Sequence, residues 1–433
     1  MGLVTRTLGE ICDEVGGIIR TGPFGSQLHQ SDYQDEGLPV IMPKDIVDGR
    51  VSVEGITRIG DKDVARLSQH RLQKGNIVYG RRGDIGRRAL ITEREAGWLC
   101  GTGCLRVSLG ESVLDPTFLY YYLGESKVIA WIYNQAIGAT MPNLNTSIIR
   151  RIPITYPPLP IQRKIAAILS AYDRLIENNT RRIEILEEMA RSIYREWFVK
   201  FRFPGHEQVQ MVDSELGLIP EGWEVKILGE VANFYRGKSY KSAELVKDGG
   251  LPFLNLKCIK RDGGFRDDGL KRFNGPYKET QTARVGDIIM AVTDMTQERR
   301  IVARSALVPR TGEDVFVLSM DLVKIAPKDV AFSNYLYGML RFSGFADQVK
   351  EYANGANVLH LNPNRIEEFK FASPPQDMTK NYARFCGSLY QECDILILKN
   401  ANLRQTRDLL LPRLISGEID VENLDINTGE IAA

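Results

Sequence analysis

An internal repeat constrains this chain more than any other sequence feature, because the second half restates the first. The tripeptide Gly-Leu-Pro at residues 37–39 recurs at residues 250–252, an offset of 213 (250 − 37). Further along the chain the offset becomes 217, and the Pro-Pro pair at 157–158 recurs at 374–375. Self-similarity of this kind indicates that one structural unit has been duplicated. A length of 433 residues also exceeds what one core usually supports, so two or more domains are expected.

Each half is predicted to contain a mixed α/β (α+β) globular segment. Short β-rich runs between Gly-containing turns predict strands at residues 76–79 and 287–290. Helices are predicted to follow within residues 116–132 and 332–352. The fold class predicted from these patterns is therefore two mixed α/β domains in tandem.

One loop of the repeat differs in length between the halves. The offset grows from 211 (286 − 75) to 217 (306 − 89), so the second half carries six additional residues there. They fall in the loop that includes residues 292–300, at the place where the first half has residues 81–88. The shared strands therefore carry loops that have diverged.

A long helix is predicted after each Pro-Pro pair, because apolar residues recur there at alternating spacings of three and four. Each seam has one irregular step of two successive fours, at 168–172–176 and at 385–389–393. The predicted seam residues are Ile165, Ile168, Tyr172, Ile176, Ile183, Leu186 and Ile193, then Tyr382, Phe385, Leu389, Leu396, Leu403, Leu410 and Leu414. Helices of about 40 residues extend about 60 Å, too far for one small domain to cover. We therefore expect the two helices to form an antiparallel coiled coil, with the halves related by a pseudo-two-fold axis.

The expected order of domains follows from these boundaries. It consists of a first globular domain (1–155), a first long spacer helix (156–204), a linker with the second globular domain (205–375), a second long spacer helix (376–416) and an acidic C-terminal tail (417–433).

Composition limits the possible surroundings of the chain. Six cysteines are too few for a disulfide scaffold and indicate reduced thiols in a cytoplasm. No apolar run approaches the roughly 20 residues of a membrane-spanning helix, so no membrane partner is expected. The formal net charge is +1, so any binding of nucleic acid must come from local basic patches or from a complex with other proteins.

No catalytic or metal-binding motif can be read from the sequence. Residues 236–239 (Arg-Gly-Lys-Ser) end like a phosphate-binding loop, but Ala232 stands where its leading glycine belongs. Residues 362–365 (Asn-Pro-Asn-Arg) lack the second proline and the aromatic residue of an amino-methyltransferase motif. Cys100 and Cys104 offer two zinc ligands without a second pair, and buried thiols at a turn are the favoured alternative. We therefore predict a non-enzymatic chain with no bound metal or cofactor.

Basic residues gather in the diverged loops of both halves, which favours a role in binding DNA. Arginine side chains match phosphates and the guanine edge, while Asp, Gln and Thr can contact other base edges. For any single arginine, the alternative is an ordinary solvated surface position. The candidate DNA-binding residues are Arg81, Arg82, Arg87, Arg88, Arg236, Lys238, Thr293, Asp294, Gln297, Arg299 and Arg300.

Four segments, in this order, resemble the specificity subunits of type I restriction–modification systems. They are residues 21–28 (Thr-Gly-Pro-Phe-Gly-Ser-Gln-Leu), 139–145 leading into 157–162, 218–223 (Leu-Ile-Pro-Glu-Gly-Trp) and 411–419 (Leu-Pro-Arg-Leu-Ile-Ser-Gly-Glu-Ile). The second half departs from the first, since Tyr-Arg-Gly-Lys-Ser at 235–239 stands in place of a Gly-Pro-Phe-Gly-Ser turn.

The resemblance implies two target recognition domains that read an asymmetric bipartite site in double-stranded DNA, held at a fixed spacing by the helices. It also implies methyltransferase subunits, typically two, which bind S-adenosylmethionine and methylate adenine N6 in a prokaryotic cytoplasm. In systems that also cleave DNA, a motor–nuclease subunit would use ATP and Mg²⁺. The alternatives are a non-catalytic coiled-coil scaffold and an RNA-binding adaptor.

Overall fold

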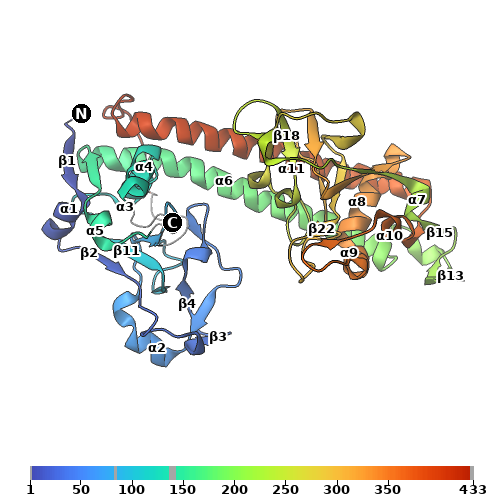
Figure 1. Cartoon of the computed structure of the whole chain (residues 1–433), viewed down its shortest axis with the longest axis horizontal. Coiled ribbons are helices and arrows are strands. Elements are labelled where there is room, and N and C mark those ends of the chain that lie inside the picture. Colours follow the sequence, from blue (N-terminus) through green and yellow to red (C-terminus); the bar gives the residue numbers. More distant parts are fainter. Residues whose placement is uncertain (1, 82–84, 136–142, 430–433) are drawn as a thin grey trace. The chain divides into compact units, whose positions relative to one another are not determined.

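The computed structural model describes residues 2–81, 85–135 and 143–429. The chain divides into two compact units, of which the first combines residues 1–176 with 403–433 and the second comprises residues 177–402. Both units contain small β-sheets, short helices and part of each of two long helices (Figure 1). The first unit is thus discontinuous in sequence, because the end of the second long helix and the segment after it belong to it.

The main sheet of the first unit has four antiparallel strands. Its order is β2 (Ile18–Thr21), β11 (Cys104–Ser108), β8 (Ile77–Gly80) and β9 (Arg88–Leu90). Alternate residues of β8 face opposite sides, as the period of a strand requires. Ile77 and Tyr79 join the core beneath the helices, whereas Val78 joins a second core with Ile41 and Cys104. The sheet is therefore covered on both faces.

A smaller sheet and several short helices complete the first unit. The sheet runs β10 (Leu99–Cys100), β4 (Leu38–Ile41), β7 (Thr57–Ile59) and β3 (Tyr33–Gln34), with β10 and β4 parallel. β1 (Val4–Thr7) pairs with β12 (Pro153–Tyr156), and β5 (Ile46–Val47) pairs with β6 (Arg50–Val51). The helices are α1 (Leu8–Glu14), α2 (Asp61–Arg66), α3 (Pro116–Tyr122), α4 (Ser126–Gln135) and α5 (Thr146–Arg150).

The second unit repeats this strand order. Its main sheet runs β16 (Ala232–Arg236), β25 (Leu322–Pro327), β21 (Ile288–Ala291) and β23 (Ser305–Leu307), again antiparallel. The strands are connected along the chain as in the first unit, with the fourth strand of the sequence lying second in the sheet. The predicted repeat and the predicted strands at 76–79 and 287–290 are therefore confirmed.

The remaining strands of the second unit keep the parallel pair of the smaller sheet but differ in number from those of the first unit. The second sheet is β17 (Leu245–Val246), β19 (Lys271–Phe273), β18 (Leu251–Leu254), β24 (Val315–Leu318) and β20 (Thr282–Arg284), with β18 and β24 parallel. β15 (Glu224–Ile227) pairs with β27 (Lys370–Ser373), β13 (Met211–Ser214) with β14 (Gly217–Pro220), and β22 (Thr293–Asp294) with β26 (Leu359–His360). The short helices are α7 (Leu228–Val231), α8 (Ser333–Phe342), α9 (Phe345–Val349) and α10 (Pro363–Glu367).

Matching asparagines begin a short helix in each unit. The side chain of Asn145 accepts a hydrogen bond from the backbone of Ile148 at 2.9 Å and caps α5. Asn362 caps α10 by accepting from the backbone of Asn364 at 3.1 Å, with Pro363 in the first turn. The Asn-Pro-Asn-Arg sequence thus forms the start of a helix.

Both long helices are present. α6 (Leu159–Tyr194) has 36 residues and continues into a π-helical turn at Arg195–Val199. α11 (Gln376–Ile415) has 40 residues and contains Pro412 in its last turn. Figure 1 shows them as the two longest ribbons, in green and red.

Thirteen of the fourteen predicted seam residues are buried or half-buried, and Phe385 is the exception. The Phe385 side chain is 52% exposed and touches Trp197 only edge-on, whereas the neighbouring Cys386 is fully buried in the core of the second unit. The prediction of Phe385 was therefore wrong. With Cys386 in the seam, the steps from Tyr382 through Leu389 alternate four and three, so the irregular step predicted at 385–389–393 is wrong as well.

Within each unit α6 and α11 are in contact, and residues later in α6 contact residues earlier in α11. In the second unit Asn179 donates to Asn400 at 3.0 Å, and Arg182 pairs with Glu392 at 2.9 Å. In the first unit Asp173 pairs with Arg407. Nearer the start of α6, Ile161, Ile165 and Leu169 share a core with Leu414 and Ile415.

Candidate nucleic-acid interface

In both units, a close contact between backbone segments shapes the turn that follows the first strand of the main sheet. A Cβ atom on Gly22 would lie 2.0 Å from the carbonyl oxygen of Gly101, and one on Gly237 would lie 2.1 Å from that of Ser319. The amide of Gly22 donates to Cys104 at 2.9 Å, and that of Gly237 donates to Leu322 at 3.1 Å. Both positions therefore require glycine, and the two turns share a backbone although their sequences differ.

In the first unit, two of the candidate arginines, at the two ends of the diverged loop, donate hydrogen bonds to backbone carbonyls. Arg81 Nε donates to the carbonyl of Leu144 at 3.0 Å. Arg88 Nε donates to the carbonyl of Tyr120 at 2.9 Å, and its guanidinium lies 4.9 Å from the centre of the Tyr120 ring. Arg87 is exposed, and Arg82 lies outside the described residues. Of the described candidates here, Arg87 has the most open position.

In the second unit, Thr293 and Asp294 are buried and build the longer loop. The Asp294 carboxylate accepts from the amides of Thr296 and Ile301, both at 2.8 Å. Burial alone would raise the pKa of Asp294, but these hydrogen bonds hold it below its usual value. Thr293 donates to Asp321 at 3.0 Å and is 0% exposed. Their burial argues against the predicted contact of these two side chains with base edges.

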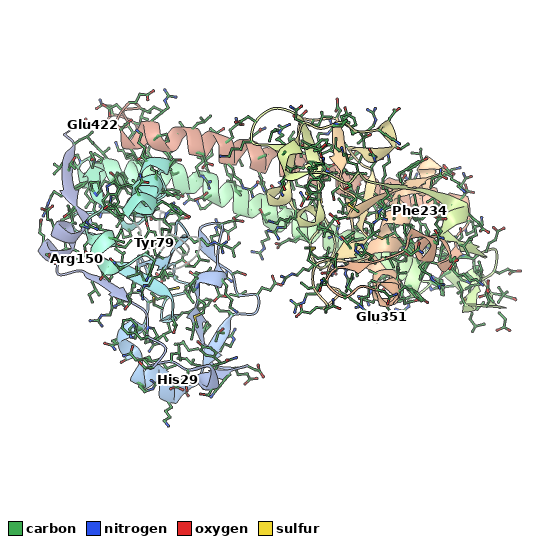
Figure 2. All side chains as sticks on the ribbon, in the orientation of Figure 1. His29, Tyr79, Arg150, Phe234, Glu351 and Glu422 are labelled. Atoms are coloured by element: carbon green, nitrogen blue, oxygen red, sulfur yellow. The ribbon has the colours of Figure 1, made fainter. Side chains whose placement is uncertain are left out.

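The arginines of the longer loop have acidic partners that the sequence order conceals. Arg299 pairs with Glu351, which lies on the surface of the second unit (Figure 2), and Arg304 pairs with Asp347 at 2.9 Å. Arg300 pairs with Glu298 within the loop. The sequence stretch that holds these arginines is therefore not an unbalanced basic patch, because α9 and the turn after it supply carboxylates.

The remaining candidates of the second unit are held by backbone carbonyls. Arg236 Nε donates to Met320 at 3.1 Å, and Gln297 donates to Ala356 at 3.0 Å. Lys238 donates to Pro276, lies 3.5 Å from Glu244 and sits 4.9 Å from the centre of the Phe273 ring. Lys238 thus stabilises the fold of the turn, while Arg236 and Gln297 keep exposed side chains beside the loop.

Sequence reasoning missed a basic group in the first unit that strand pairing creates. Arg20 on β2 lies directly opposite Arg106 on β11, close to His70 and Arg71. Each arginine is a single charge between apolar or small neighbours in a short strand, as in Leu105-Arg106-Val107. A lone charge within a strand pattern was the available signal, but it did not identify the partner.

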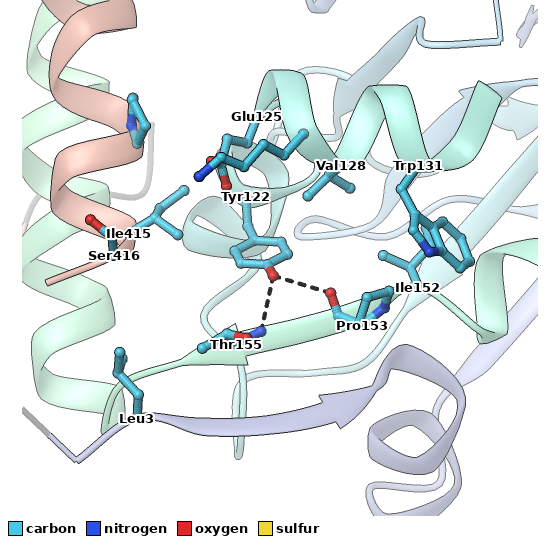
Figure 3. Close-up of a pocket in the computed structure, with 12 residues that line it drawn as sticks. Leu3, Tyr122, Glu125, Val128, Trp131, Ile152, Pro153, Thr155, Ile415 and Ser416 are labelled. Carbon is cyan, nitrogen blue, oxygen red and sulfur yellow. Dashed lines mark hydrogen bonds and ion pairs between the residues drawn. The ribbon is translucent and has the colours of Figure 1, made fainter. Parts of the chain in front are cut away.

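The first unit also has a pocket of about 470 Å³ beside α4, β12 and the end of α11 (Figure 3). Its lining is mostly apolar and includes Leu3, Val128, Trp131 and Ile415. The Tyr122 hydroxyl in this pocket donates to Pro153 at 3.1 Å and accepts from the amide of Thr155 at 3.0 Å. The hydroxyl is thus already satisfied within the fold.

The thiols and the acidic residues give no sign of catalysis in the part of the chain that the structure describes. The six cysteines are free and buried, and burial raises the pKa of Cys100 to about 12. Cys100 is therefore a protonated thiol at neutral pH, as the favoured alternative to a zinc ligand requires. Over residues 2–81, 85–135 and 143–429, no group of three His, Cys, Asp or Glu side chains is placed to hold a metal ion. Nor does any described helix combine the length and hydropathy of a membrane span.

Comparison with known proteins agrees with this two-unit organisation. The family model described as "Type I restriction modification DNA specificity domain" matches the chain twice, at residues 2–188 and 220–403. The MjaIX specificity subunit of Methanocaldococcus jannaschii is 26% identical over 407 residues, which cover 91% of this chain and 89% of that protein. The HindI specificity subunit of Haemophilus influenzae is 20% identical, over 83% of this chain and 89% of that protein.

A solved structure shares the fold over nearly the whole chain. The crystal structure of the type I restriction–modification system S subunit from M. genitalium superposes with a TM-score of 0.54 at 18% identity, covering 96% of each chain. The family model accounts for most of the sequence in two copies, and each copy contains one of the repeated main sheets. The chain therefore belongs to the family of type I restriction–modification DNA specificity subunits.

Proposed function

We propose that each unit reads one half of a bipartite DNA target and that the two half-sites differ. The observation that carries this proposal is the repeat of the strand order with loops that do not repeat. The main sheets have the same order, yet the loop after β21 is six residues longer (217 − 211) than the loop after β8 and has a buried Asp294 at its base. A common frame with different loops suits two readers of different sequences.

The long helices are proposed to act as an antiparallel coiled-coil spacer between the two readers. The contacts of Asn179 with Asn400 and of Asp173 with Arg407 support this arrangement. A polar pair such as Asn179–Asn400, in which Asn400 is buried and Asn179 half-buried, favours one register over others.

The chemistry is proposed to reside in partner subunits. Methyltransferase subunits, typically two, would bind S-adenosylmethionine and methylate adenine N6 in the prokaryotic cytoplasm. A motor–nuclease subunit, where one is present, would bind ATP and Mg²⁺. This chain would supply the DNA address and bind no cofactor itself.

The direct test is to map adenine methylation after co-expression of the chain with its methyltransferase subunit. We expect one methylated sequence with two unlike half-sites separated by unread bases. A palindromic site, or methylation without sequence preference, would contradict the proposal.

Exchanging the outer part of one unit is expected to change one half-site only. The graft should replace residues 18–108, from the start of β2 to the end of β11, with those of a relative of different specificity. These bounds leave β1, α1, α3 to α5 and the end of α11 unchanged. Because β8 and β11 add Ile77, Tyr79, Leu105 and Val107 to the core around Leu414, the relative must carry apolar residues at these four positions. The matched graft of residues 232–327 should change the other half-site. Methylation maps of both chimaeras check this, and a change in both half-sites from one graft would refute independent reading.

A further inference from the structure

Arg20 and Arg106 form an unbalanced pair of like charges in the first unit. They lie directly opposite each other on the antiparallel strands β2 and β11. Like charges opposite each other in a sheet destabilise it. Arg106 is only 8% exposed, so water screens its side of the repulsion poorly.

The groups around this pair add positive or neutral character. Arg20 donates to the Gln69 amide oxygen at 3.2 Å, and Arg106 donates to the carbonyl of Arg71. His70 is 5% exposed, and its Nε2 is buried without a hydrogen-bond partner. Among the described residues no carboxylate forms an ion pair with Arg20 or Arg106.

At the equivalent position of the second unit, the positive charge is neutralised. The residues opposite each other there are Tyr235 and Lys324, and the Lys324 ammonium lies 5.3 Å from the centre of the Tyr235 ring. Lys324 also lies 3.8 Å from the Asp287 carboxylate. This unit thus places one cation between an aromatic face and an acid.

Strand register identifies the residue that takes the place of this acid in the first unit. Lys324 faces Ile289, two residues after Asp287, and Arg106 faces Val78, two residues after Asn76. Asn76 is therefore the counterpart of Asp287. The first unit has exchanged the acid for an amide and the tyrosine for a second arginine.

The charges of this cluster also disfavour further protonation nearby. Burial lowers the pKa of His70, and Arg20 and Arg106 lower it further. Burial, with Arg20, likewise lowers the pKa of Arg106. These shifts describe a site that lacks a negative charge. An anion placed there would relieve the repulsion between the two arginines and favour the protonated imidazole, whose Nε2–H could then donate to the anion.

The cluster lies beside the loops that the proposed function assigns to DNA. β2 ends at Thr21, one residue after Arg20, and leads into the Gly22 turn. β11 begins at Cys104, and the preceding Gly103 accepts from the amide of Arg81 at 2.8 Å. The guanidinium pair is thus within a few residues of both the glycine turn and the diverged loop.

We propose that Arg20 and Arg106, with His70 beside them, bind one phosphate group of the DNA backbone. This inference rests on the proposed function and adds an anchoring contact that the second unit lacks at the equivalent position. Two guanidinium groups match the several oxygens of a phosphate. A phosphate contact orients the unit on the duplex and carries no base preference.

The test measures the salt dependence of duplex binding by the complex of the full chain with its methyltransferase subunit. Arg20→Gln should reduce the slope of log K against log salt by about 0.9, equally for a target duplex and an unrelated duplex. Asn76→Asp should have the same effect, because it installs the acid of the second unit. Its carboxylate still accepts from the amide of Gln73, and Ser108 can donate to it in place of accepting from the Asn76 amide.

Measurements of the melting temperature distinguish a phosphate-binding site from a cluster whose role is only structural. Asn76→Asp should leave the melting temperature unchanged or raise it, since it neutralises a repulsion while binding weakens. Lys324→Gln is the matched control in the second unit, and its slope should equal that of the wild type. A duplex series with one neutral methylphosphonate per molecule should show one sensitive position in the wild type that is insensitive in Arg20→Gln.

The outcomes distinguish this inference from the proposed function. Wild-type slopes in Arg20→Gln and Asn76→Asp, with specific methylation intact, would overturn the phosphate site alone. A wild-type complex that binds and methylates without sequence preference would overturn the proposed function instead. A loss restricted to the target duplex would also contradict the inference, because it would indicate base reading.

Discussion

Replacing Glu187 by alanine is expected to lower the free energy of unfolding of the second unit by about 3–5 kcal/mol. Glu187 on α6 forms two bonds to Arg341 on α8, at 3.2 and 2.9 Å. The Arg341 side chain is 3% exposed and also donates to the Tyr337 hydroxyl at 2.8 Å. Without Glu187 the guanidinium keeps its cost of burial and loses its counter-charge. Urea unfolding of wild type and variant measures the difference.

A neighbouring ion pair provides the control for that experiment. Glu188 pairs with Arg191 on the surface of α6 at 3.2 Å, and its side chain is 61% exposed. Glu188→Ala should change the stability by less than about 0.5 kcal/mol, because exposed pairs contribute little. Equal effects of the two substitutions would contradict a special role for the buried pair.

The effect of Glu187 should also depend on pH. Burial alone would raise the pKa of Glu187, but the hydrogen bond and charge of Arg341 outweigh burial and lower it. A carboxyl group whose pKa is lower in the folded state stabilises the fold above its unfolded pKa. This contribution is lost as the pH falls through the folded pKa. The difference between wild type and Glu187→Ala should therefore be largest near neutral pH and shrink in acid.

Lengthening both long helices by seven residues is expected to widen the unread gap of the DNA target by about three base pairs, or to abolish methylation. Under the proposed spacer role, the insertions belong where the two units divide, between Ile176 and Glu177 in α6 and between Asn402 and Leu403 in α11. Seven helical residues add about 10 Å, which corresponds to about three base pairs at 3.4 Å each. Methylation mapping measures the gap, and an unchanged gap with full activity would refute the spacer.

The phase of the seam supplies the control for the insertions. Seven residues rotate a helix by about 20° less than two full turns, so the seam stays on nearly the same face. An insertion of five residues rotates the following residues by about 140° and should turn the seam away from its partner. We expect that variant to lose assembly with the methyltransferase, which gel filtration and methylation assays would both report.

Periodicity and repeat alone predicted much of the fold. The alternation at Ile77, Val78 and Tyr79 is a local property of the sequence, so the strand could be placed before its neighbours were known. The choice between Phe385 and Cys386 could not be made in this way, because both are apolar and adjacent. It is decided by the aromatic core of the second unit, where Tyr337 and Tyr382 come from distant positions.

The candidate interface was less predictable, because charge balance is a three-dimensional property. Arg299 meets Glu351 across 52 positions of sequence, so a stretch that reads as basic is locally neutral. Arg20 and Arg106 lie 86 positions apart (106 − 20), and only the strand register brings them opposite each other. Composition located the basic loops, whereas strand pairing and packing determined which basic side chains in the two units have an acidic partner.

The discontinuous first unit has a consequence for how the chain folds during synthesis. Its core includes Leu414, Ile415 and Val421, which leave the ribosome after the whole of residues 177–402. At 5–20 residues per second, translation of those 226 residues (402 − 177 + 1) takes roughly 10–45 s. During this interval the first unit lacks part of its core and cannot complete its fold. The second unit, in contrast, has all its residues as soon as residue 402 has left the ribosome. The half of the protein that is made first is thus the half that closes last.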